Sequence, residues 1–278
     1  MALARDGSRY AARGLPTRSA GVKLASQMLS RSAVAIDWVE IPAGTLVRGT
    51  PLERVEAIAR AHEDIAVQRG WISKEAPRAE VSVAAFAVSR TPISVAQWRL
   101  FAAQSGRFGT GDGQPADHPI DGVSWEAARA FCRWLSKQAG FVVRLPTETE
   151  WERAARGSDE REYPWGDRYA SGCGNLADLA IGRTTAVGSF PRGASPFGVL
   201  DLVGNVDEWT ATPYAPYPGA PPDVPALETW AKDPHITRGG GFFHHRDLAR
   251  CARRHGLYRP QLGAGFRIVR DIADPAAP

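Results

Sequence analysis

Glycine and proline recur every few residues between Gly157 and Gly265, and this spacing limits the folds open to the chain. Aromatic residues are interleaved with them, and no helical periodicity is sustained across the segment. The backbone groups of such a stretch must be satisfied by turns, side chains, water or bound ions. We therefore expect a large packed domain whose second half has little regular secondary structure.

The first half carries clearer signals of regular elements. Residues 35–47 predict a β-hairpin that turns at Pro42-Ala43-Gly44, and residues 81–88 predict a strand. Glu150 stands at the capping-box position of the last of four predicted helices. The starts of those helices are marked by Pro51, Ser94, Ser124 and Thr147.

Charge is concentrated at the two ends of the chain. Residues 1–31 hold six basic residues and one acid, and residues 238–270 hold eight arginines and one acid. The net charge of the 278 residues is only +4, so the body between these segments is acidic. This pattern argues against a uniformly basic nucleic-acid binder. No apolar run approaches the ~20 residues that span a bilayer, so we expect no membrane segment.

The three cysteines, Cys132, Cys173 and Cys251, cannot pair fully within one chain, and no CxxC motif is present. We therefore expect a reducing compartment and a cytoplasmic protein. Residues 1–33 are basic and lack periodicity, which predicts a disordered tail. Arginines interrupt any secretory apolar core there, and an Arg- and Ser-rich transit peptide is the alternative.

Several motifs now follow one another in a characteristic order. They are VEIPAG (39–44), TPIS (91–94), HP (118–119), VSW (123–125), RLPTETEWE (144–152), YPWGD (163–167), GVLDLVGNVDEWT (198–210), RGG (238–240) and GFR (265–267). In this order they resemble the formylglycine-generating enzyme (sulfatase-modifying factor) family, which includes ergothioneine- and pyoverdine-biosynthesis proteins. The resemblance covers residues 34–271 and leaves 272–278 as a short tail. It implies a single α+β domain related to C-type lectins.

The same resemblance implies structural calcium. Asp201 with nearby backbone carbonyls suits a hard cation, since calcium takes six to eight oxygen ligands. A second family site has a later acidic ligand in a loop that this sequence shortens, with Asp178 as the nearest candidate. Ordinary turn asparagines are the alternative interpretation. The ligand positions carried over from the family are Asp201, Leu202, Gly204 and Val206 at the first site, and Asn175 and Leu176 at the second.

The chemistry of the standard family enzyme is missing from this sequence. That enzyme uses copper, oxygen and a cysteine pair that follows the Arg-Gly-Gly motif. Here His244 stands at the first cysteine position, and the second falls in a deletion near Leu248. We therefore do not expect formylglycine generation.

The candidate catalytic residues are instead His244 and His245. Imidazole binds copper and iron, so His244 with one more histidine, of which His235 and His255 lie nearby in sequence, could hold either metal. Adjacent residues of an extended segment point to opposite sides, which disfavours His244 and His245 on one ion. Histidines that merely line a groove are the alternative.

Arginines and aromatic residues crowd the same segment. Arginine favours carboxylates and phosphates and stacks on aromatic rings, so we expect an anionic small molecule, amino acid or peptide. The alternative is that several of these arginines pair with acids of the body. The candidate substrate-binding residues are Phe242, Phe243, Arg246, Arg250, Arg254 and Tyr258.

Two classes of function are compatible with these residues. The first is a metal-dependent oxidoreductase of a biosynthetic pathway that oxidises an amino acid, a peptide or another anionic substrate. The second is a non-catalytic lectin-like module that presents residues 238–263 to an anionic ligand or a protein partner.

Overall fold

The computed structural model describes residues 34–106, 108–109, 111–225, 234–256 and 263–272. The chain divides into two units, Met1–Val34 and Ala35–Pro278, and every helix and strand below lies in the second. Among the described residues, no helix is both long enough and apolar enough to cross a membrane.

Five α-helices are present in the described part, and the predicted starts at Ser94, Ser124 and Thr147 are confirmed. Pro51 instead precedes a 3₁₀ turn, Leu52–Arg54, and the α-helix after it begins at Val55. Ser94 Oγ accepts a hydrogen bond from the Gln97 amide at 3.3 Å, and Thr147 Oγ1 accepts one from the Glu150 amide at 3.2 Å. Such caps satisfy amides that have no partner within the helix. The helices are α2 (Val55–Ala61), α3 (Arg69–Ser73), α4 (Val95–Ser105), α5 (Trp125–Ala139) and α6 (Glu148–Arg156).

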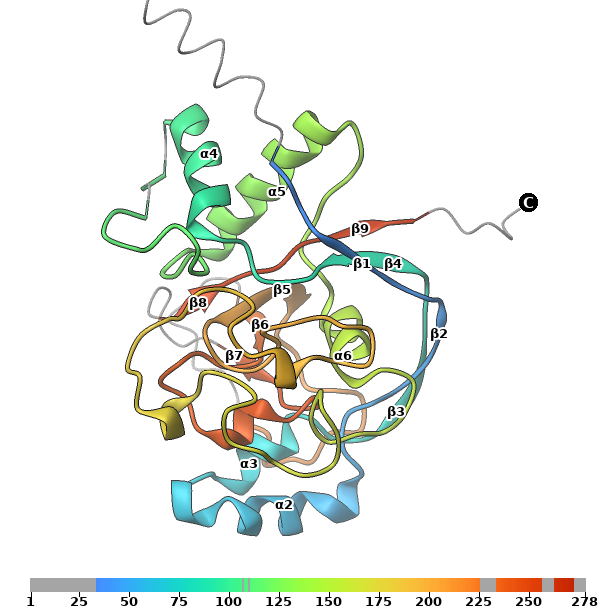
Figure 1. Cartoon of the computed structure of the whole chain (residues 1–278). Helices are drawn as coiled ribbons and strands as arrows, with labels where there is room; N and C mark the ends of the chain where they lie inside the picture. The colour runs from blue at the N-terminus through green and yellow to red at the C-terminus, as the bar shows by residue number, and fades with distance from the viewer. Residues whose placement is uncertain (1–33, 107, 110, 226–233, 257–262, 273–278) are drawn as a thin grey trace, which may run out of the picture. The chain divides into compact units, whose positions relative to one another are not determined.

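The strands of the described residues form three small sheets (Figure 1). Antiparallel sheets of order β1-β4-β9 and β2-β3 use β1 (Trp38–Ile41), β2 (Gly44–Arg48), β3 (Ala79–Val83), β4 (Phe86–Ser89) and β9 (Val269–Asp271). The third sheet has the order β7-β6-β5-β8, in which only the β5–β8 pair is parallel. Its strands are β5 (Asp207–Pro213), β6 (His235–Arg238), β7 (His255–Gly256) and β8 (Ala264–Gly265).

The predicted hairpin of residues 35–47 is wrong. β1 pairs with β4 and β2 pairs with β3, in a register that places Ile41 opposite Phe86 and Gly44 opposite Val83. One antiparallel ribbon is therefore bent at residues 42–43, where Pro42 has no amide to donate to a ladder. The single strand predicted for 81–88 is divided between β3 and β4 for the same reason, because it is the partner of the bent strand.

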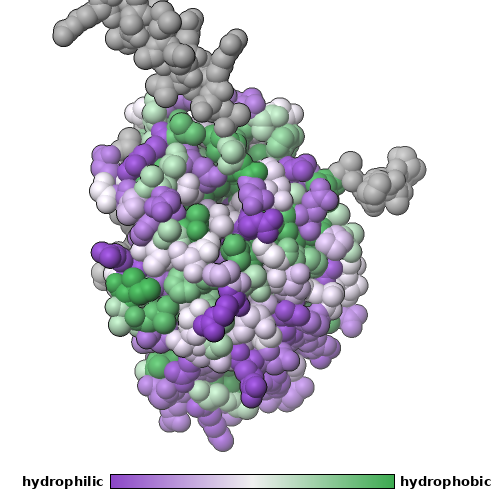
Figure 2. All heavy atoms as spheres, viewed as in Figure 1, coloured by the Kyte–Doolittle hydropathy of each residue, from purple (hydrophilic) through white to green (hydrophobic). Residues whose placement is uncertain are grey.

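Aromatic rings and α6 fill the interior. Trp98 packs on Phe101, Phe131 and Phe266 with ring centroids 5.0–6.1 Å apart, which joins α4, α5 and the segment after β8. Helix α6 lies against the third sheet, and its residues Trp151 and Ala154 belong to a buried hydrophobic cluster of the domain. Polar side chains gather on the surface around α2, at the lower end of the view in Figure 2.

Buried ion pairs join α6 to the third sheet. Arg238 of β6 donates to Glu152 of α6 at 2.8 Å, and both side chains are fully buried. Arg267 donates to both oxygens of Glu208 in β5 at 2.5 and 2.7 Å. The strands that carry the candidate site are thus held by charged contacts as well as by the sheet ladder.

Candidate active site

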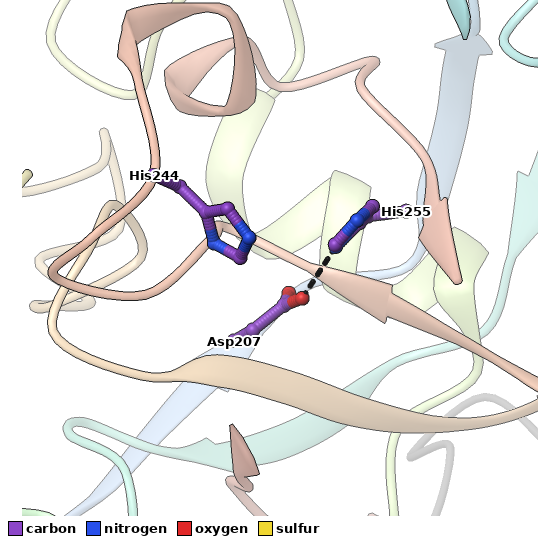
Figure 3. Close-up of side chains that lie close together, drawn as sticks. All are labelled: Asp207, His244 and His255. Carbon is purple, nitrogen blue, oxygen red and sulfur yellow. Dashed lines mark hydrogen bonds and ion pairs between the residues drawn. The ribbon is translucent and has the colours of Figure 1, made fainter. Parts of the chain in front are cut away.

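Asp207, His244 and His255 converge at one end of the third sheet (Figure 3). Asp207 begins β5 and His255 begins β7, while His244 lies in the loop after β6. One possible ligand atom from each residue falls within 4.8 Å of the others. In the described part of the chain this is the only group of three or more His, Cys, Asp or Glu with that geometry.

The loop that carries His244 depends on two glycines. Gly239 and Gly240 have φ angles of +88° and +72°, a backbone conformation that residues with a Cβ atom rarely adopt. A Cβ on Gly239 would also lie 2.7 Å from the carbonyl oxygen of Leu202. The RGG motif therefore reverses the chain at the end of β6, and this turn brings His244 back over the sheet.

Asp207 is a buried carboxylate with one oxygen in use. Its Oδ2 accepts hydrogen bonds from Thr237 Oγ1 at 2.9 Å and from His255 Nδ1 at 2.6 Å. Burial opposes ionisation, but the charge and hydrogen bond of His255 and the Thr237 hydroxyl outweigh it and hold the pKa of Asp207 below its usual value. The other oxygen, Oδ1, is buried and has no hydrogen-bond partner among the described residues.

The two imidazoles meet edge to face. Their ring centroids are 5.0 Å apart with an interplanar angle of 83°. Because His255 Nδ1 donates to Asp207, a neutral His255 ring presents Nε2 as its acceptor. Burial is the main cause that lowers the pKa of His244 to about 4, so this ring is neutral at pH 7.

His244 has a second constraint from its own loop. Its Nδ1 accepts a hydrogen bond from the Gly241 amide at 2.8 Å. A neutral ring in this tautomer carries its proton on Nε2, where it cannot bind a metal. Metal binding by His244 Nε2 would therefore require the ring to turn away from the Gly241 amide.

A pocket of about 400 Å³ opens in front of both histidines. One wall is apolar and comes from the segment around α3 together with Leu248: Ile65, Ala66, Val67, Trp71 and Leu248. The remaining lining residues are polar, namely Lys74, His244, His245, Asp247, Arg253 and His255. A concave, mainly apolar space with a few convergent polar groups is typical of a site for a small molecule.

Lys74 is the most perturbed cation of this pocket. It follows α3 and is only 2% exposed. Burial, reinforced by the charges of Arg253 and Arg254, lowers the pKa of Lys74 to about 7. An amine with such a pKa exchanges protons readily near neutral pH.

The predicted histidines and aromatic residues occupy different places. His244 belongs to the Asp207–His244–His255 cluster, whereas His245 is exposed and lines the outer part of the pocket. Phe242 and Phe243 form an edge-to-face pair, and the Phe243 ring lies 4.2 Å from the His244 ring. Tyr258 lies outside the described residues.

The predicted substrate-binding arginines are engaged with acids of the body. Arg246 pairs with Asp64 at 2.5 Å near the surface. Arg250 is buried between Glu75, at 2.7 Å, and Glu162. Arg254 donates to both oxygens of the buried Glu148, at 2.7 and 2.9 Å. Pairing with acids of the body, the alternative to ligand binding, therefore describes all three arginines. The guanidinium groups of Arg250 and Arg254 are buried in these pairs and do not face a ligand.

Residues 26–272 match the family model of the sulfatase-modifying factor enzyme 1-like domain. The chain belongs to this family. Hercynine oxygenase from Mycolicibacterium thermoresistibile is 30% identical over 75% of this chain, which spans 56% of that relative's length. Formylglycine-generating enzyme from Mycobacterium tuberculosis is 34% identical, over 67% of this chain and 71% of its own.

The structure of PvdO from Pseudomonas aeruginosa has a similar fold. The two share 26% identity at a TM-score of 0.66, over 86% of this chain and 95% of that chain. The formylglycine-generating-enzyme-like α+β fold expected from the sequence is therefore confirmed.

The stretches that the family resemblance assigns to calcium are buried turns. Asn205 Oδ1 accepts from the Thr185 amide at 2.8 Å and from Asn175 Nδ2 at 3.3 Å. Asn175 Oδ1 is buried without a hydrogen-bond partner among the described residues, and burial raises the pKa of Asp201 to about 6. An orphaned oxygen fits a cation.

The other proposed ligands are less specific. Leu176, Leu202 and Val206 have hydrocarbon side chains without a donor atom, so they could contribute only backbone oxygens. Gly204 likewise offers only its backbone, and its carbonyl accepts from the Val206 amide at 2.8 Å. Asp178 instead accepts a hydrogen bond from the Tyr169 hydroxyl at 2.8 Å. Calcium binding stays a prediction.

The cysteines offer no substitute for the family's catalytic pair. All three are free and buried, and burial raises the pKa of both Cys132 and Cys251 to about 12. Cys132 and Cys251 are therefore protonated thiols at neutral pH, unlike the thiolates that suit Cu(I).

Sequence reasoning missed Asp207 and Lys74. Asp207 lies in the GNVDEW stretch, which was assigned to calcium alone, and its contact with His255 arises only from the pairing of β5, β6 and β7. Lys74 follows α3 in a segment without a family motif. The sequence signal that could have indicated Asp207 is an acid at the start of a strand, followed later in the chain by segments that carry histidines.

Proposed function

We propose that this chain is an oxidoreductase that acts on an amino-acid derivative with a metal ion held by Asp207, His244 and His255. The observation that carries the proposal is the unpartnered, buried Oδ1 of Asp207 beside two imidazoles at a small-molecule pocket. Two histidines and one carboxylate are the donor set of non-haem iron oxygenases, and imidazole also suits copper. The similarity to hercynine oxygenases supports an oxidation of this kind.

The residues of the chain would divide the work as follows. Oδ2 of Asp207 orients His255 through Nδ1, so that Oδ1 of Asp207 and Nε2 of His255 are the groups offered to a metal. Burial keeps His244 neutral, as ligation requires, and its ring would turn away from the Gly241 amide to offer Nε2 without a proton. The apolar wall excludes water from the substrate's side. A bound iron or copper ion would supply the electron transfer to oxygen that side chains alone cannot supply.

Metal analysis of purified protein tests this assignment. The protein is stripped with a chelator, reloaded with Fe(II) under anaerobic conditions or with Cu(II), desalted, and measured by mass spectrometry. We expect roughly one ion per chain in the wild type and a loss of most of it in His244→Ala and His255→Ala.

His245→Ala is the matched control, because it removes the neighbouring, exposed histidine of the same loop. Equal metal content in all four proteins would refute the site. Wild-type protein that takes up neither metal would refute the proposed function and would favour a non-catalytic binding module.

A further inference from the structure

A second pocket, of about 490 Å³, lies at the opposite end of β5 from Asp207. Ala211 and Pro213 of β5 line it, together with residues of α5, the first residue of β6 and residues 143–145 before α6. It shares no lining residue with the pocket of about 400 Å³ described above. Because a strand rises about 3.3 Å per residue, Ala211 lies roughly 13 Å from Asp207 along β5. The two pockets are therefore separate sites.

Three arginines line this second pocket, and none of the described lining residues is acidic. Arg144 has acidic partners outside the pocket, Glu150 at 2.7 Å and Asp271 at 2.5 Å. Arg129 and Arg133 are exposed, and neither forms an ion pair with a described residue. They stand four positions apart on α5, where like charges repel each other. An anion between them would relieve this repulsion.

An aromatic contact holds Arg129 at the pocket. Its guanidinium carbon lies 4.6 Å from the centre of the Trp125 ring. Trp125 is itself fixed, since its Nε1 donates to the carbonyl oxygen of Thr210 at 2.9 Å. Its ring also stacks on the buried His235, with ring centroids 3.6 Å apart. A guanidinium that rests on an indole keeps N–H groups available for an anion, and less ordering is left for the ligand to bring about.

The rest of the lining is mainly apolar. Cys132, Val143, Leu145, Ala211 and Pro213 contribute to it. Burial raises the pKa of the Cys132 thiol to about 12, so Cys132 adds no negative charge at neutral pH. Two cationic side chains beside apolar surface, in a pocket of small-molecule size, are typical of a site for an anion that carries an apolar body.

The spacing of the two arginines selects the anion. Side chains four positions apart on a helix have Cβ atoms about 5–6 Å apart, so the guanidinium groups of Arg129 and Arg133 can reach one group together. A phosphate monoester offers three terminal oxygens and about two negative charges at pH 7, which is enough for both. A single carboxylate has two oxygens and one charge, which suit one guanidinium.

We infer that this pocket binds a phosphate monoester with a small apolar body. The phosphate contacts Arg129 and Arg133, and the body lies against Val143 and Leu145. Trp125 contributes by holding Arg129, because its ring is already in contact with that guanidinium and with His235. The site lies outside the Asp207 cluster, so the inference does not depend on the proposed oxidation.

Three probes test the inference by calorimetry on metal-free protein. Phenyl phosphate carries both features of the expected ligand. Phenyl sulfate has the same body and three terminal oxygens but one negative charge, and inorganic phosphate lacks the apolar body. Each is titrated into wild type and into Arg129→Met and Arg133→Met, which keep an unbranched side chain and remove the charge. Lys137→Met, at an exposed lysine of α5 that does not line the pocket, is the matched control.

We expect wild type and Lys137→Met to bind phenyl phosphate about tenfold more tightly than either other probe, through the second charge and the apolar contact. Arg129→Met and Arg133→Met should each weaken binding of phenyl phosphate about five- to tenfold. Unchanged affinity in either arginine variant would overturn the inference, as would phenyl sulfate or inorganic phosphate that binds wild type as tightly as phenyl phosphate. Failure of wild type to bind phenyl phosphate at millimolar concentration would also overturn it. The metal content of the Asp207 cluster is measured separately, so none of these results decides the proposed function.

Discussion

Replacing Lys74 by methionine should change stability in a way that depends on pH. Burial and two neighbouring arginines lower the pKa of Lys74 from 10.5 to about 7 in the folded state. A pKa gap of about 3.5 between the unfolded and folded states corresponds to about 5 kcal/mol, and is an upper bound for the penalty of burying the charge. Methionine fills a similar volume and carries no such penalty.

The sign of the effect follows from proton uptake. Below pH 7 the lysine is charged in both states, so the whole penalty opposes folding of the wild type. Between pH 7 and pH 10.5 the folded state has released its proton while the unfolded state retains it, and the wild type gains stability as pH rises. The stability advantage of Lys74→Met should therefore be largest at pH 6 and smaller by about 3–4 kcal/mol at pH 10.

Urea denaturation of ligand-free, metal-free protein at pH 6, 8 and 10 measures this difference. Groups that titrate in both proteins cancel, and loss of packing contributes a constant offset. Lys137→Met should show a stability difference within about 0.5 kcal/mol of zero at every pH. If the difference in unfolding free energy between Lys74→Met and wild type does not vary with pH, the argument that burial lowers the pKa of Lys74 is refuted.

Three further outcomes are expected. Asp207→Asn should weaken binding of Fe(II) or Cu(II) at least about tenfold in a competition titration with a chelator dye, because it removes the anionic ligand; unchanged affinity would exclude Asp207 from the site. Chelation of calcium should lower the melting temperature at pH 7.5 and much less at pH 5, since burial raises the pKa of Asp201 to about 6 and only its carboxylate binds calcium; no change at either pH would contradict calcium at that turn. Arg267→Met should destabilise the fold by about 3–5 kcal/mol in urea, because Glu208 would be buried without its partner. A loss no larger than that of Arg161→Met, which removes a partly exposed pair, would show that the buried contact contributes little.

Local signals predicted local structure well. Ser94, Ser124 and Thr147 cap helices as expected, because an N-cap is decided by residues three or four positions apart. Where the structure describes the Gly- and Pro-rich second half, that half has only short strands and 3₁₀ turns, as its composition predicts. The ordered motifs were sufficient to predict the family and its fold, because they record many turns and contacts at once.

Long-range contacts were beyond the reach of the same reasoning. The hairpin expected at residues 35–47 fails because β1 and β2 do not pair with each other but with β4 and β3, whose paired residues are 31–51 positions away. Arg250 and Arg254 looked like ligand-binding cations, but their partners, Glu75 and Glu148, come from distant elements. The residues next to an arginine in the sequence do not indicate whether a distant carboxylate of the same chain will pair with it.

The sequence by itself determined the family, the α+β fold, the loss of the catalytic cysteine pair and the prominence of His244. Only the tertiary structure decided that Asp207 and His255 join His244, and that Lys74 lies in the pocket they share. The physical reason is that strand pairing and the Gly239–Gly240 turn bring His244 and His255 to Asp207, from which they are 37 and 48 positions away. The segment after α3 adds Lys74, which lies 133 positions before Asp207. Such a site depends on which residues of different strands lie side by side, and the sequence of any one strand does not specify that pairing.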